Sequence, residues 1–499
     1  MINKISSALI SVFDKKGILP FVNFLYKKNV KIISTGGTAK FLKKNGIKIF
    51  KVNDLTNFPE ILDGRVKTLH PNVFGGILFR RDNKKDLEEV SKNKISPIDL
   101  VLVNLYPFDK VSAKDFTKKI EMIDIGGPSI LRAAAKNFQF TTVLSEKSDF
   151  KLVKKEIDKF GNTSLETRQN LAAKVFSQTT KYDAKIAKFF DKGFFAAFGN
   201  NGKELRYGEN PHQKAKFFSE KESIKFEKLH GKEMSYCNFL DTDAAIGLGS
   251  EFIDQNFCAI FKHANPCGAA IGKNIREAFL KAHNADPISA FGGIIVLSKK
   301  CDIKTAKEIV KAGFFEIILA LDFDKVALEV LKKKKNLRVL KIKKFKIPKK
   351  NFRKTNLGIL EQDADQSVIS SKDLKYINSD KINQKEKVEL DFAWKICKYL
   401  KSNAIVLVKD GVTVGLGIGQ TSRVNSMKIA ISFAGKNAKN AVCASDAFFP
   451  FPDAIEIAAK AGIKTIIQPG GSIRDNDVFK KAKEMNIKMC LTATRVFRH

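Results

Sequence analysis

The chain is poor in the residues that mark metal-bound and disulfide-stapled proteins. Its 499 residues include six histidines, seven cysteines and one tryptophan. The cysteines are odd in number, scattered, and include no CxxC pair, which argues against a disulfide framework and against a structural zinc site. Unpaired cysteines fit a reducing compartment. We therefore expect a cytoplasmic protein that requires no metal.

Long apolar segments are also lacking. No window of 18 or more apolar residues escapes interruption by charge, so we expect no spanning helix and no membrane partner. The first residues, MINKISSALISVFDKKG, contain a short apolar run without a small-residue cleavage pattern, and we interpret them as a first strand. The hydrophobic content of 44% is typical of a globular chain.

Acidic residues are scarce beside basic ones, at 53 against 89, which gives a formal charge of +36. Such a charge suggests nucleic acid, but no helix-turn-helix, RRM or zinc-finger pattern accompanies it. Lys is abundant everywhere, so we attribute the charge to composition and expect no nucleic-acid partner. The basic segment 331–350 predicts a solvated helix end followed by a strand that alternates apolar residues with Lys.

Apolar strands alternate with helical patterns over the first 200 residues. Strands are expected at 6–13, 30–34, 99–106 and 139–145, with a TGGT loop at 35–38 and a helix at 39–46. This alternation predicts an α/β fold with a doubly wound parallel sheet. A long helix is predicted from Thr163 to Phe190, opened by a capping box formed by Thr163 and Glu166.

Gly and Asn crowd together after this helix, and the helical periodicity stops. We place the main boundary there and expect domains at 1–198 and 199–499. The second domain shows strand patterns at 256–263, 288–298 and 337–347, and helical patterns at 272–284, 303–312 and 385–401. A weaker interruption at 352–372 divides it into two subdomains.

The first candidate site combines a glycine turn with basic residues. STGGT, at 34–38, lies between a predicted strand and a predicted helix. This position is suited to binding an anion, although an ordinary tight turn is the alternative. SVFDKKG occupies the equivalent strand end one unit earlier, and DGRVKTLHP supplies Arg65 and Lys67. Ligands of open α/β sheets bind at the carboxyl ends of strands, so Lys15, the 35–38 turn, Arg65 and Lys67 are expected to converge on a phosphate.

Two further strand ends carry polar residues. VLVNLYPF provides Asn104 and Tyr106, and DIGGPSILRAAAKN provides Asp124 and Lys136. Tyr106 is equally compatible with core packing, and Asp124 with a helix cap. As a set at successive strand ends, they offer the acid, the base and the hydrogen-bond donors of an active site.

The second domain holds a further candidate base. In FKHANPCG, Lys262 and His263 end an apolar run, and like-charge repulsion would disfavour the protonated imidazole, leaving a neutral base near pH 7. A surface Lys beside a satisfied His is the alternative. In LRYGENPHQ, Arg206 lies next to Tyr207. An Arg beside an aromatic residue is suited to binding a phosphate and a flat base.

GVTVGLGIGQTSR contains a G-x-G-x-G pattern but is not a dinucleotide fingerprint. Asp410-Gly411 predicts a type I′ hairpin, which places the glycines in or beyond a hairpin strand and leaves Arg423 as a candidate ligand contact. ASDAFFPFPD offers a ring-stacking pocket, and QPGGSIRD adds a glycine loop.

These motifs together resemble the PurH family of bifunctional purine biosynthesis proteins, which join an IMP cyclohydrolase to an AICAR transformylase. The likeness runs from SVFDKKG through STGGTA, GRVKTLHP, NLYPF, RYGENPHQ, KHANPCG, GQTSR and SDAFFPF to His499. It implies a methylglyoxal-synthase-like cyclohydrolase domain at 1–198 and two cytidine-deaminase-like subdomains at 199–499. It also implies a homodimer with transformylase sites at the subunit interface.

The resemblance assigns roles for the formyl transfer from the co-substrate 10-formyltetrahydrofolate to AICAR. His263 would be the base, Lys262 would stabilise negative charge or supply a proton, and Asn403 would assist. The residues that would hold AICAR are Arg206, Tyr207, Gly292, Glu316, Arg423, Phe448 and Arg495. Asp453 and the Gly470-Gly471 loop would face the folate.

It also assigns roles for the closure of FAICAR to IMP. Lys67, Tyr106, Asp124 and Lys136 would be the catalytic residues. The nucleotide-binding residues would be Asp14, Lys15, Thr35, Gly36, Gly37, Thr38, Arg65, Thr68, Asn104 and Ile125. Two rival interpretations remain: a phosphate-binding lyase or sensor of the methylglyoxal-synthase type, and a basic RNA-associated protein.

Overall fold

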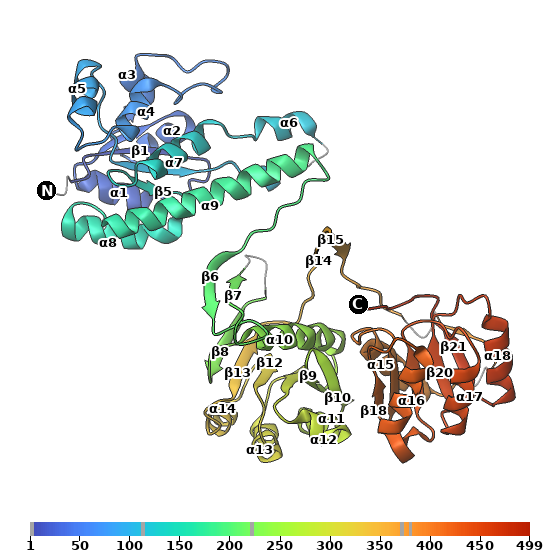
Figure 1. The fold of residues 1–499 in the computed structure, drawn as a ribbon. Helices are drawn as coiled ribbons and strands as arrows, with labels where there is room; N and C mark the ends of the chain where they lie inside the picture. Colours follow the sequence, from blue (N-terminus) through green and yellow to red (C-terminus); the bar gives the residue numbers. More distant parts are fainter. Residues whose placement is uncertain (1–3, 111–114, 220–223, 370–373, 379–381) are drawn as a thin grey trace. The chain divides into compact units, whose positions relative to one another are not determined.

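The computed structural model describes residues 4–110, 115–219, 224–369, 374–378 and 382–499. The chain divides into two compact units, residues 1–198 and 199–499, which are described separately (Figure 1). These ranges equal the two domains expected from the sequence, while the activity of each unit remains a prediction. No helix within the described ranges has the length and apolar character needed to cross a bilayer.

Unit 1, residues 1–198, contains a five-stranded parallel sheet in the order β3-β2-β1-β4-β5. Its strands are β1 (Ser7–Val12), β2 (Lys31–Ser34), β3 (Phe50–Lys51), β4 (Leu100–Asn104) and β5 (Thr142–Leu144). Its helices are α1 (Leu19–Lys27), α2 (Gly36–Lys44), α3 (Val52–Thr56), α4 (Pro71–Leu78), α5 (Lys84–Lys92), α6 (Phe116–Glu121), α7 (Gly126–Lys136), α8 (Phe150–Phe160) and α9 (Leu165–Phe190).

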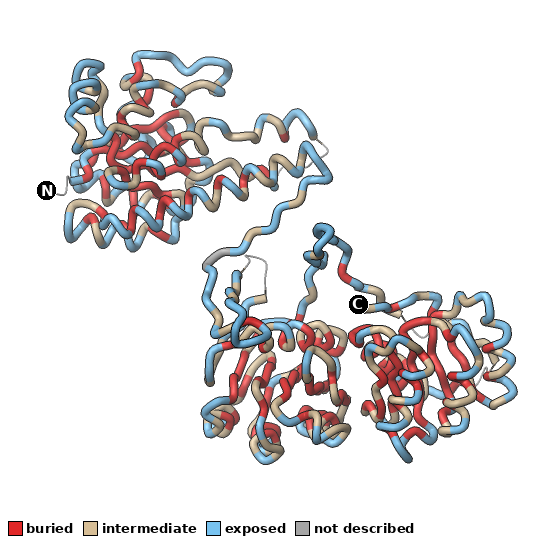
Figure 2. Tube along the Cα trace, viewed as in Figure 1, coloured by how far each residue is buried: buried red, intermediate tan, exposed pale blue. Residues whose placement is uncertain are grey.

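The central strands of unit 1 are buried on both faces, as their continuous apolar runs require. Four consecutive residues of β1 and four of β4 are buried, and α7 packs three alanines of its last two turns against the sheet (Figure 2). The parallel order confirms the doubly wound sheet predicted from the sequence.

Two local predictions in unit 1 are wrong. The glycines of STGGT form the first turn of α2, which begins at Gly36, instead of a loop before it. Helix α9 is capped by Ser164, whose hydroxyl accepts a hydrogen bond from the N–H of Thr167 at 3.1 Å. The Thr163 hydroxyl instead makes a buried hydrogen bond with that of Thr142, so the proposed capping box does not form.

Unit 2, residues 199–499, is built on one twelve-stranded mixed sheet in the order β16-β21-β20-β19-β17-β18-β10-β9-β11-β12-β13-β8. Its strands are β8 (Phe226–His230), β9 (Phe257–Lys262), β10 (Asn265–Ile271), β11 (Ile294–Leu297), β12 (Ile317–Ala320), β13 (Arg338–Ile342), β16 (Lys375–Tyr376), β17 (Ile405–Lys409), β18 (Val412–Gly417), β19 (Val442–Ser445), β20 (Thr465–Gln468) and β21 (Lys488–Leu491).

Helices cover both faces of this sheet. They are α10 (Tyr236–Gly249), α11 (Ile275–Ala285), α12 (Pro287–Ala290), α13 (Ile303–Ala312), α14 (Lys325–Lys332), α15 (Gln384–Cys397), α16 (Arg423–Ala434), α17 (Asp453–Lys460) and α18 (Asp475–Glu484). Helices α10 and α15 share one core that spans both halves of the sheet, whereas α11, α13 and α14 cover the other face of one half and α16, α17 and α18 that of the other.

Four strands lie outside the large sheet, in two hairpins: β6 (Asn200–Leu205) with β7 (Ala215–Ser219), and β14 (Lys350–Thr355) with β15 (Gly358–Asp363). The second hairpin occupies the interruption expected at 352–372, between the two halves of unit 2. The halves nevertheless share one hydrogen-bonded sheet, joined where Ala270 of β10 pairs with Val412 of β18.

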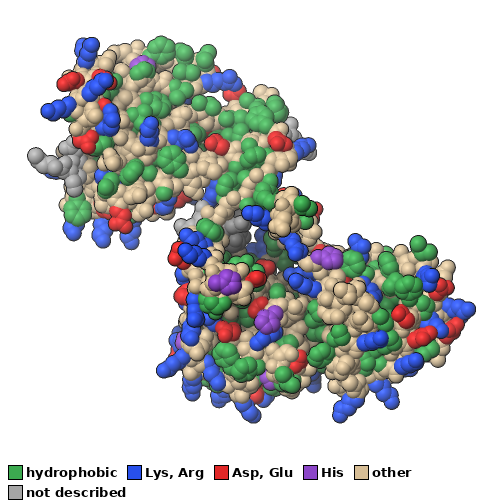
Figure 3. Space-filling view, in the orientation of Figure 1, with side chains coloured by type: hydrophobic (Ala, Val, Ile, Leu, Met, Phe, Trp, Pro, Cys, Tyr) green, Lys and Arg blue, Asp and Glu red, His purple; other side chains and the backbone are tan. Residues whose placement is uncertain are grey.

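The strand within the basic segment 331–350 is more buried than the sequence suggested. Strand β13 lies between β12 and β8, and four of its five residues are buried, including Arg338. Lys341 is the partly exposed member and forms an ion pair with Asp322 at 2.7 Å. Elsewhere Lys and Arg are spread over the visible face of each unit instead of gathering in one patch, in keeping with a compositional origin of the charge (Figure 3).

Candidate active sites

Unit 1 has a cavity of about 520 Å³ at the carboxyl ends of β1, β2 and β4. The N-termini of α2 and α7 open onto it, and neither has a side-chain cap from its N-cap residue, so backbone N–H groups and the positive ends of two helix dipoles favour an anion there. Twelve of the residues singled out in the sequence line this cavity: Lys15, Thr35, Gly36, Gly37, Thr38, Arg65, Lys67, Thr68, Asn104, Tyr106, Asp124 and Ile125.

Two ammonium groups flank the glycine turn of α2. A Cβ atom placed on Gly37 would lie 3.7 Å from Lys15 Nζ, and one placed on Gly36 would lie 3.9 Å from Lys67 Nζ. Gly36 also has a positive φ of 53°, which side chains disfavour. Because Gly36 and Gly37 have no side chains, space remains between the ammonium groups of Lys15 and Lys67 and the N-terminus of α2.

Carboxylates pair with two of the cationic groups of this cavity. Arg65 forms an ion pair with Glu121, and Lys67 Nζ lies 3.6 Å from Glu60 Oε1. The first pair is exposed and the second is partly exposed, so each contributes little to stability. A phosphate entering the cavity can replace these carboxylates without a large energetic cost.

Asp124 lines the cavity two residues before α7 begins. Its Oδ1 atom accepts a hydrogen bond from the N–H of Gly127 at 2.8 Å, so the helix-cap interpretation is confirmed without excluding an active-site role. Burial raises the pKa of this carboxyl, against the lowering effects of the Gly127 N–H, the charge of Lys67 and the Tyr106 N–H. A carboxylate with a raised pKa is a stronger base than an ordinary Asp.

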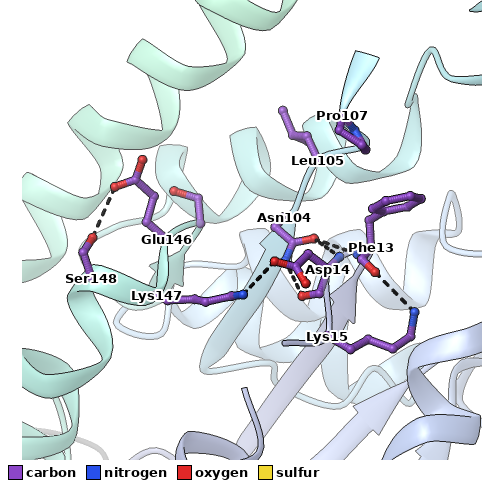
Figure 4. Close-up of a pocket in the computed structure, with 10 residues that line it drawn as sticks. Phe13, Asp14, Lys15, Asn104, Leu105, Pro107, Glu146, Lys147 and Ser148 are labelled. Carbon is purple, nitrogen blue, oxygen red and sulfur yellow. Dashed lines mark hydrogen bonds and ion pairs between the residues drawn. The ribbon is translucent and has the colours of Figure 1, made fainter. Parts of the chain in front are cut away.

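Asn104 ties the end of β4 to the end of β1. Its Oδ1 accepts from the N–H groups of Phe13 (2.7 Å) and Asp14 (3.1 Å), and its Nδ2 donates to the Asp14 carbonyl (2.9 Å). Asp14 lines an adjoining cavity of about 680 Å³ and pairs with Lys147 at 2.7 Å (Figure 4). Phe13, Lys15 and Asn104 line both cavities, so the two adjoin.

Lys136 is not brought together with these residues. It is the last residue of α7 and is exposed, about 15 Å along the helix axis from Gly126, which lines the cavity. The expectation that Lys136 shares this site therefore has no support in the geometry of unit 1.

The sequence did not reveal Tyr182, although it contacts the site. This residue of α9 is 7% exposed. Its hydroxyl accepts a hydrogen bond from the N–H of Asp124 and donates one to the carbonyl of Met122. Burial raises its pKa to about 12, so the phenol stays protonated. Its helix carries no local motif, and the contact arises only when α9 packs beside the loop before α7.

In unit 2 the strand registers place the candidate residues along one edge of the sheet. Strands β9, β18, β19, β20 and β21 end at this edge, and β10, β11, β12 and β17 begin there. The candidates at or just beyond this edge are Lys262, His263, Gly292, Glu316, Asn403, Arg423, Phe448, Gly470, Gly471 and Arg495.

Lys262 and His263 close the hairpin between β9 and β10. His263 is exposed and, like Ala264, has a positive φ, of 52° and 58°. Lys262 Nζ donates a hydrogen bond to the Phe291 carbonyl at 2.7 Å, and a Cβ placed on Gly292 would lie 3.2 Å from Nζ. Because Gly292 has no side chain, it leaves space for the ammonium group of Lys262.

A cavity of about 390 Å³ at this edge is lined by Asn403, Arg423, Phe448 and Asp453 among others. The Arg423 side chain is 6% exposed and forms an ion pair with the fully buried Asp446. Its guanidinium also donates to Asn403 Oδ1 at 2.7 Å. Asp446 was not singled out in the sequence, although it lies in the quoted ASDAFFPFPD segment.

The remaining candidates lie in loops. The Arg206 guanidinium lies over the Tyr207 ring, 5.2 Å from the ring centroid. Gly470 and Gly471 have positive φ values of 74° and 96° after β20. Arg495 is exposed and stacks over Phe497, which lines the 390 Å³ cavity.

Glu316 precedes β12 and forms an ion pair with the buried Arg338. Within the described ranges no group of three or more His, Cys, Asp or Glu side chains could hold a metal ion.

The Asp410-Gly411 hairpin is confirmed. Both residues have positive φ values, 52° and 71°, between β17 and β18. Gly415 and Gly417 lie within β18, where added Cβ atoms would come within 2.1 Å of the Ala430 carbonyl and 1.9 Å of the Ser426 carbonyl of α16. These glycines permit close packing of α16 against β18 and do not lie in a turn between a strand and a helix.

A family model described as the AICARFT/IMPCHase bienzyme matches residues 134–433, and a model described as the MGS-like domain matches residues 17–129. The chain belongs to the AICARFT/IMPCHase bienzyme family. Because the bienzyme match extends far into unit 2, the rival interpretations as a lone lyase or sensor and as an RNA-associated protein are not favoured.

Relatives along the whole chain agree with this bienzyme assignment. Proteins described as bifunctional purine biosynthesis protein PurH are 47% identical in Thermoanaerobacter sp. (strain X514), 48% in Caldicellulosiruptor saccharolyticus and 46% in Anoxybacillus flavithermus, each over 99% of both chains. A solved structure described as the crystal structure of ForH is 36% identical over 37% of this chain and 96% of its own, with a TM-score of 0.35.

Proposed function

We propose that the two units divide the last two steps of IMP synthesis between them. The chain is a bifunctional enzyme that transfers a formyl group to AICAR and then closes the product, FAICAR, to IMP with loss of water. We assign ring closure to the cavity of unit 1 and formyl transfer to the sheet edge of unit 2. The observation that carries the assignment is the meeting of two helix N-termini, two ammonium groups and the partly buried carboxyl of Asp124 in one cavity of unit 1.

In unit 1 the nucleotide phosphate binds at the N-terminus of α2, between Lys15 and Lys67. Asp124 accepts the proton of the carboxamide nitrogen as that nitrogen attacks the formyl carbon. The raised pKa of the partly buried Asp124 supports this role as a base. Tyr106 donates to the formyl oxygen, which leaves as water after a second proton transfer. The protein supplies orientation and proton transfers, and neither step calls for a metal.

In unit 2 the 5-amino group of AICAR attacks the formyl carbon of 10-formyltetrahydrofolate. His263 removes a proton from the attacking amine, and Lys262 stabilises the negative charge that develops on the formyl oxygen. The bond from the formyl carbon to N10 then breaks, and tetrahydrofolate leaves as N10 gains a proton. Asn403 precedes β17 and accepts a hydrogen bond from Arg423, and it hydrogen-bonds the reacting groups from that position.

The exposure of His263 supports a homodimer whose second subunit covers the transfer site. Ile288 is 90% exposed and Phe291 is 65% exposed, and Phe291 is the residue whose carbonyl binds Lys262. Large apolar side chains exposed beside a catalytic residue mark a surface that another chain covers. Sedimentation of the purified protein should give twice the mass of one chain.

A pair of variants tests the division of labour. Purified protein supplied with AICAR and 10-formyltetrahydrofolate should produce IMP. His263→Ala should abolish formyl transfer and leave the cyclisation of pre-formed FAICAR intact, whereas Lys67→Ala should do the reverse. Loss of both activities in either variant, with the fold retained, would contradict two independent sites.

A further inference from the structure

The hairpin that carries His263 holds two residues in a backbone conformation that their side chains disfavour. The two-residue loop between the paired residues Lys262 and Asn265 has positive φ at both His263 (52°) and Ala264 (58°). Loops of this kind normally contain Asn or Gly, which tolerate positive φ. A conformation of this kind persists only where neighbouring groups hold it.

The side chains of Asp241 and Asn265 hydrogen-bond the same peptide group of this loop. The peptide that joins His263 to Ala264 presents its N–H to Asp241 Oδ1 at 2.6 Å. Its carbonyl accepts a hydrogen bond from Asn265 Nδ2 at 3.0 Å. The peptide is therefore bound at both of its poles, and its orientation sets the direction in which the His263 side chain leaves the backbone.

Asp241 comes from outside the hairpin, on α10. Burial raises the pKa of its carboxyl, while the Ala264 N–H and the charges of His263 and Lys262 lower it. Asp241 thus binds the hairpin through the Ala264 N–H and interacts electrostatically with both residues that the proposed transfer mechanism uses. It was not among the candidates chosen from the sequence.

We propose that Asp241 is a positioning residue for formyl transfer, because it fixes the peptide between His263 and Ala264 and so aims the imidazole at the attacking amine. This inference rests on the proposed role of His263. Asp241 acts through the backbone N–H of Ala264 and does not touch the substrate.

Two substitutions separate the hydrogen bond from the charge. Asp241→Ala removes the acceptor, whereas Asp241→Asn keeps an oxygen that can accept from Ala264 and removes the negative charge. We expect Asp241→Ala to lower kcat for formyl transfer at least tenfold with KM for AICAR within threefold of the parent. Asp241→Asn should recover kcat to within threefold. Cyclisation of FAICAR should be unchanged in both variants.

Asp302→Ala is the matched control. Asp302 Oδ1 accepts a backbone N–H, that of Thr305, at 2.7 Å at the start of α13, so the variant loses the same kind of bond away from the hairpin. It should reduce thermal stability and leave kcat for formyl transfer unchanged. Hydrogen exchange at the Ala264 amide should accelerate in Asp241→Ala and remain slow in Asp302→Ala.

The outcomes distinguish the inference from the function on which it rests. If His263→Ala is inactive in formyl transfer but Asp241→Ala keeps the parent kcat, the inference alone is overturned. Equal losses in Asp241→Ala and Asp241→Asn would also overturn it, since charge would then be the cause. Full formyl transfer by His263→Ala would overturn the proposed role of His263 and the inference together.

Discussion

The hydroxyl oxygen of Tyr182 lies 2.7 Å from the backbone nitrogen of Asp124. The same hydroxyl donates a hydrogen bond to the carbonyl of Met122 at 2.9 Å, so one phenol bridges the two peptides on either side of residue 123. The carboxyl of Asp124 is in turn bound to the N–H of Gly127. The segment that delivers Asp124 to the cavity is therefore fixed from helix α9 as well as from helix α7.

Tyr182→Phe removes this bridge with little change in packing. Loss of the two hydrogen bonds should lower the free energy of unfolding of unit 1 by about 1 to 3 kcal/mol. Cyclisation should slow because Asp124 is less firmly held, whereas formyl transfer should be unaffected. Denaturant unfolding and the two separate activity assays check this. Tyr26→Phe, at an exposed tyrosine of α1, is the control and should change neither quantity.

The raised pKa of Asp124 predicts a gain in stability when its charge is removed. Burial penalises the carboxylate, so the native state holds this proton more tightly than the unfolded chain. Stability is therefore lost as the pH rises from the ordinary value of 3.8 through the raised native value, and it stays lower at pH 7.

Asp124→Asn should consequently unfold at a higher denaturant concentration than the parent at pH 7, with the advantage shrinking as the pH approaches 4, and should not cyclise FAICAR. The amide oxygen can still accept from Gly127. A variant less stable than the parent at pH 7 would refute the assigned cost of burial.

Gly36 and Gly37 should respond differently to alanine. Gly37 has no positive φ, so Gly37→Ala should match or exceed the stability of the parent. Its methyl group would lie 3.7 Å from Lys15 Nζ, in the space assigned to phosphate, and should raise KM for FAICAR about tenfold. Gly36→Ala should cost about 1 to 2 kcal/mol because its φ is 53°. An unchanged KM in Gly37→Ala would place the phosphate elsewhere.

Removal of Asp446 should leave the Arg423 guanidinium buried without its carboxylate partner. Because Asp446 is fully buried and the Arg423 side chain is 6% exposed, Asp446→Ala should destabilise unit 2 by about 3 to 5 kcal/mol and abolish formyl transfer. Cyclisation should survive, since unit 1 has its own core. Asp322→Ala breaks the more exposed pair with Lys341 and should cost under about 1 kcal/mol by the same unfolding measurement.

Local patterns predicted much of the fold because their causes are local. The helix expected at 303–312 is α13, and the Asp410-Gly411 turn has the two positive φ values that its residues favour. The cap of α9 was misplaced because Thr163 and Ser164 are both good N-cap residues. Only the buried contact between Thr163 and Thr142, which are distant in sequence, decides between them.

The sites could be predicted only in part, because some of their residues meet through contacts between segments that are distant in sequence. The polar residues at the strand ends of unit 1 were identifiable because parallel strands all present their carboxyl ends at one edge. The grouping in unit 2 depends on the pairing of β10 with β18, which joins strands about 140 residues apart and leaves no local signal. Tyr182 and Asp241 reach their partners through helix packing, which residue spacing does not encode.

The pairing of β10 with β18 decides where this chain can be cut. A break near residue 198 separates two units with separate cores, and each fragment keeps its own sheet whole. A break in the β14–β15 hairpin would instead strip β10 of its neighbour, expose an unpaired strand edge and open the core shared by α10 and α15. Split-protein reporters and domain grafts built from this enzyme should therefore use the first junction, because halves divided at the second are expected to aggregate.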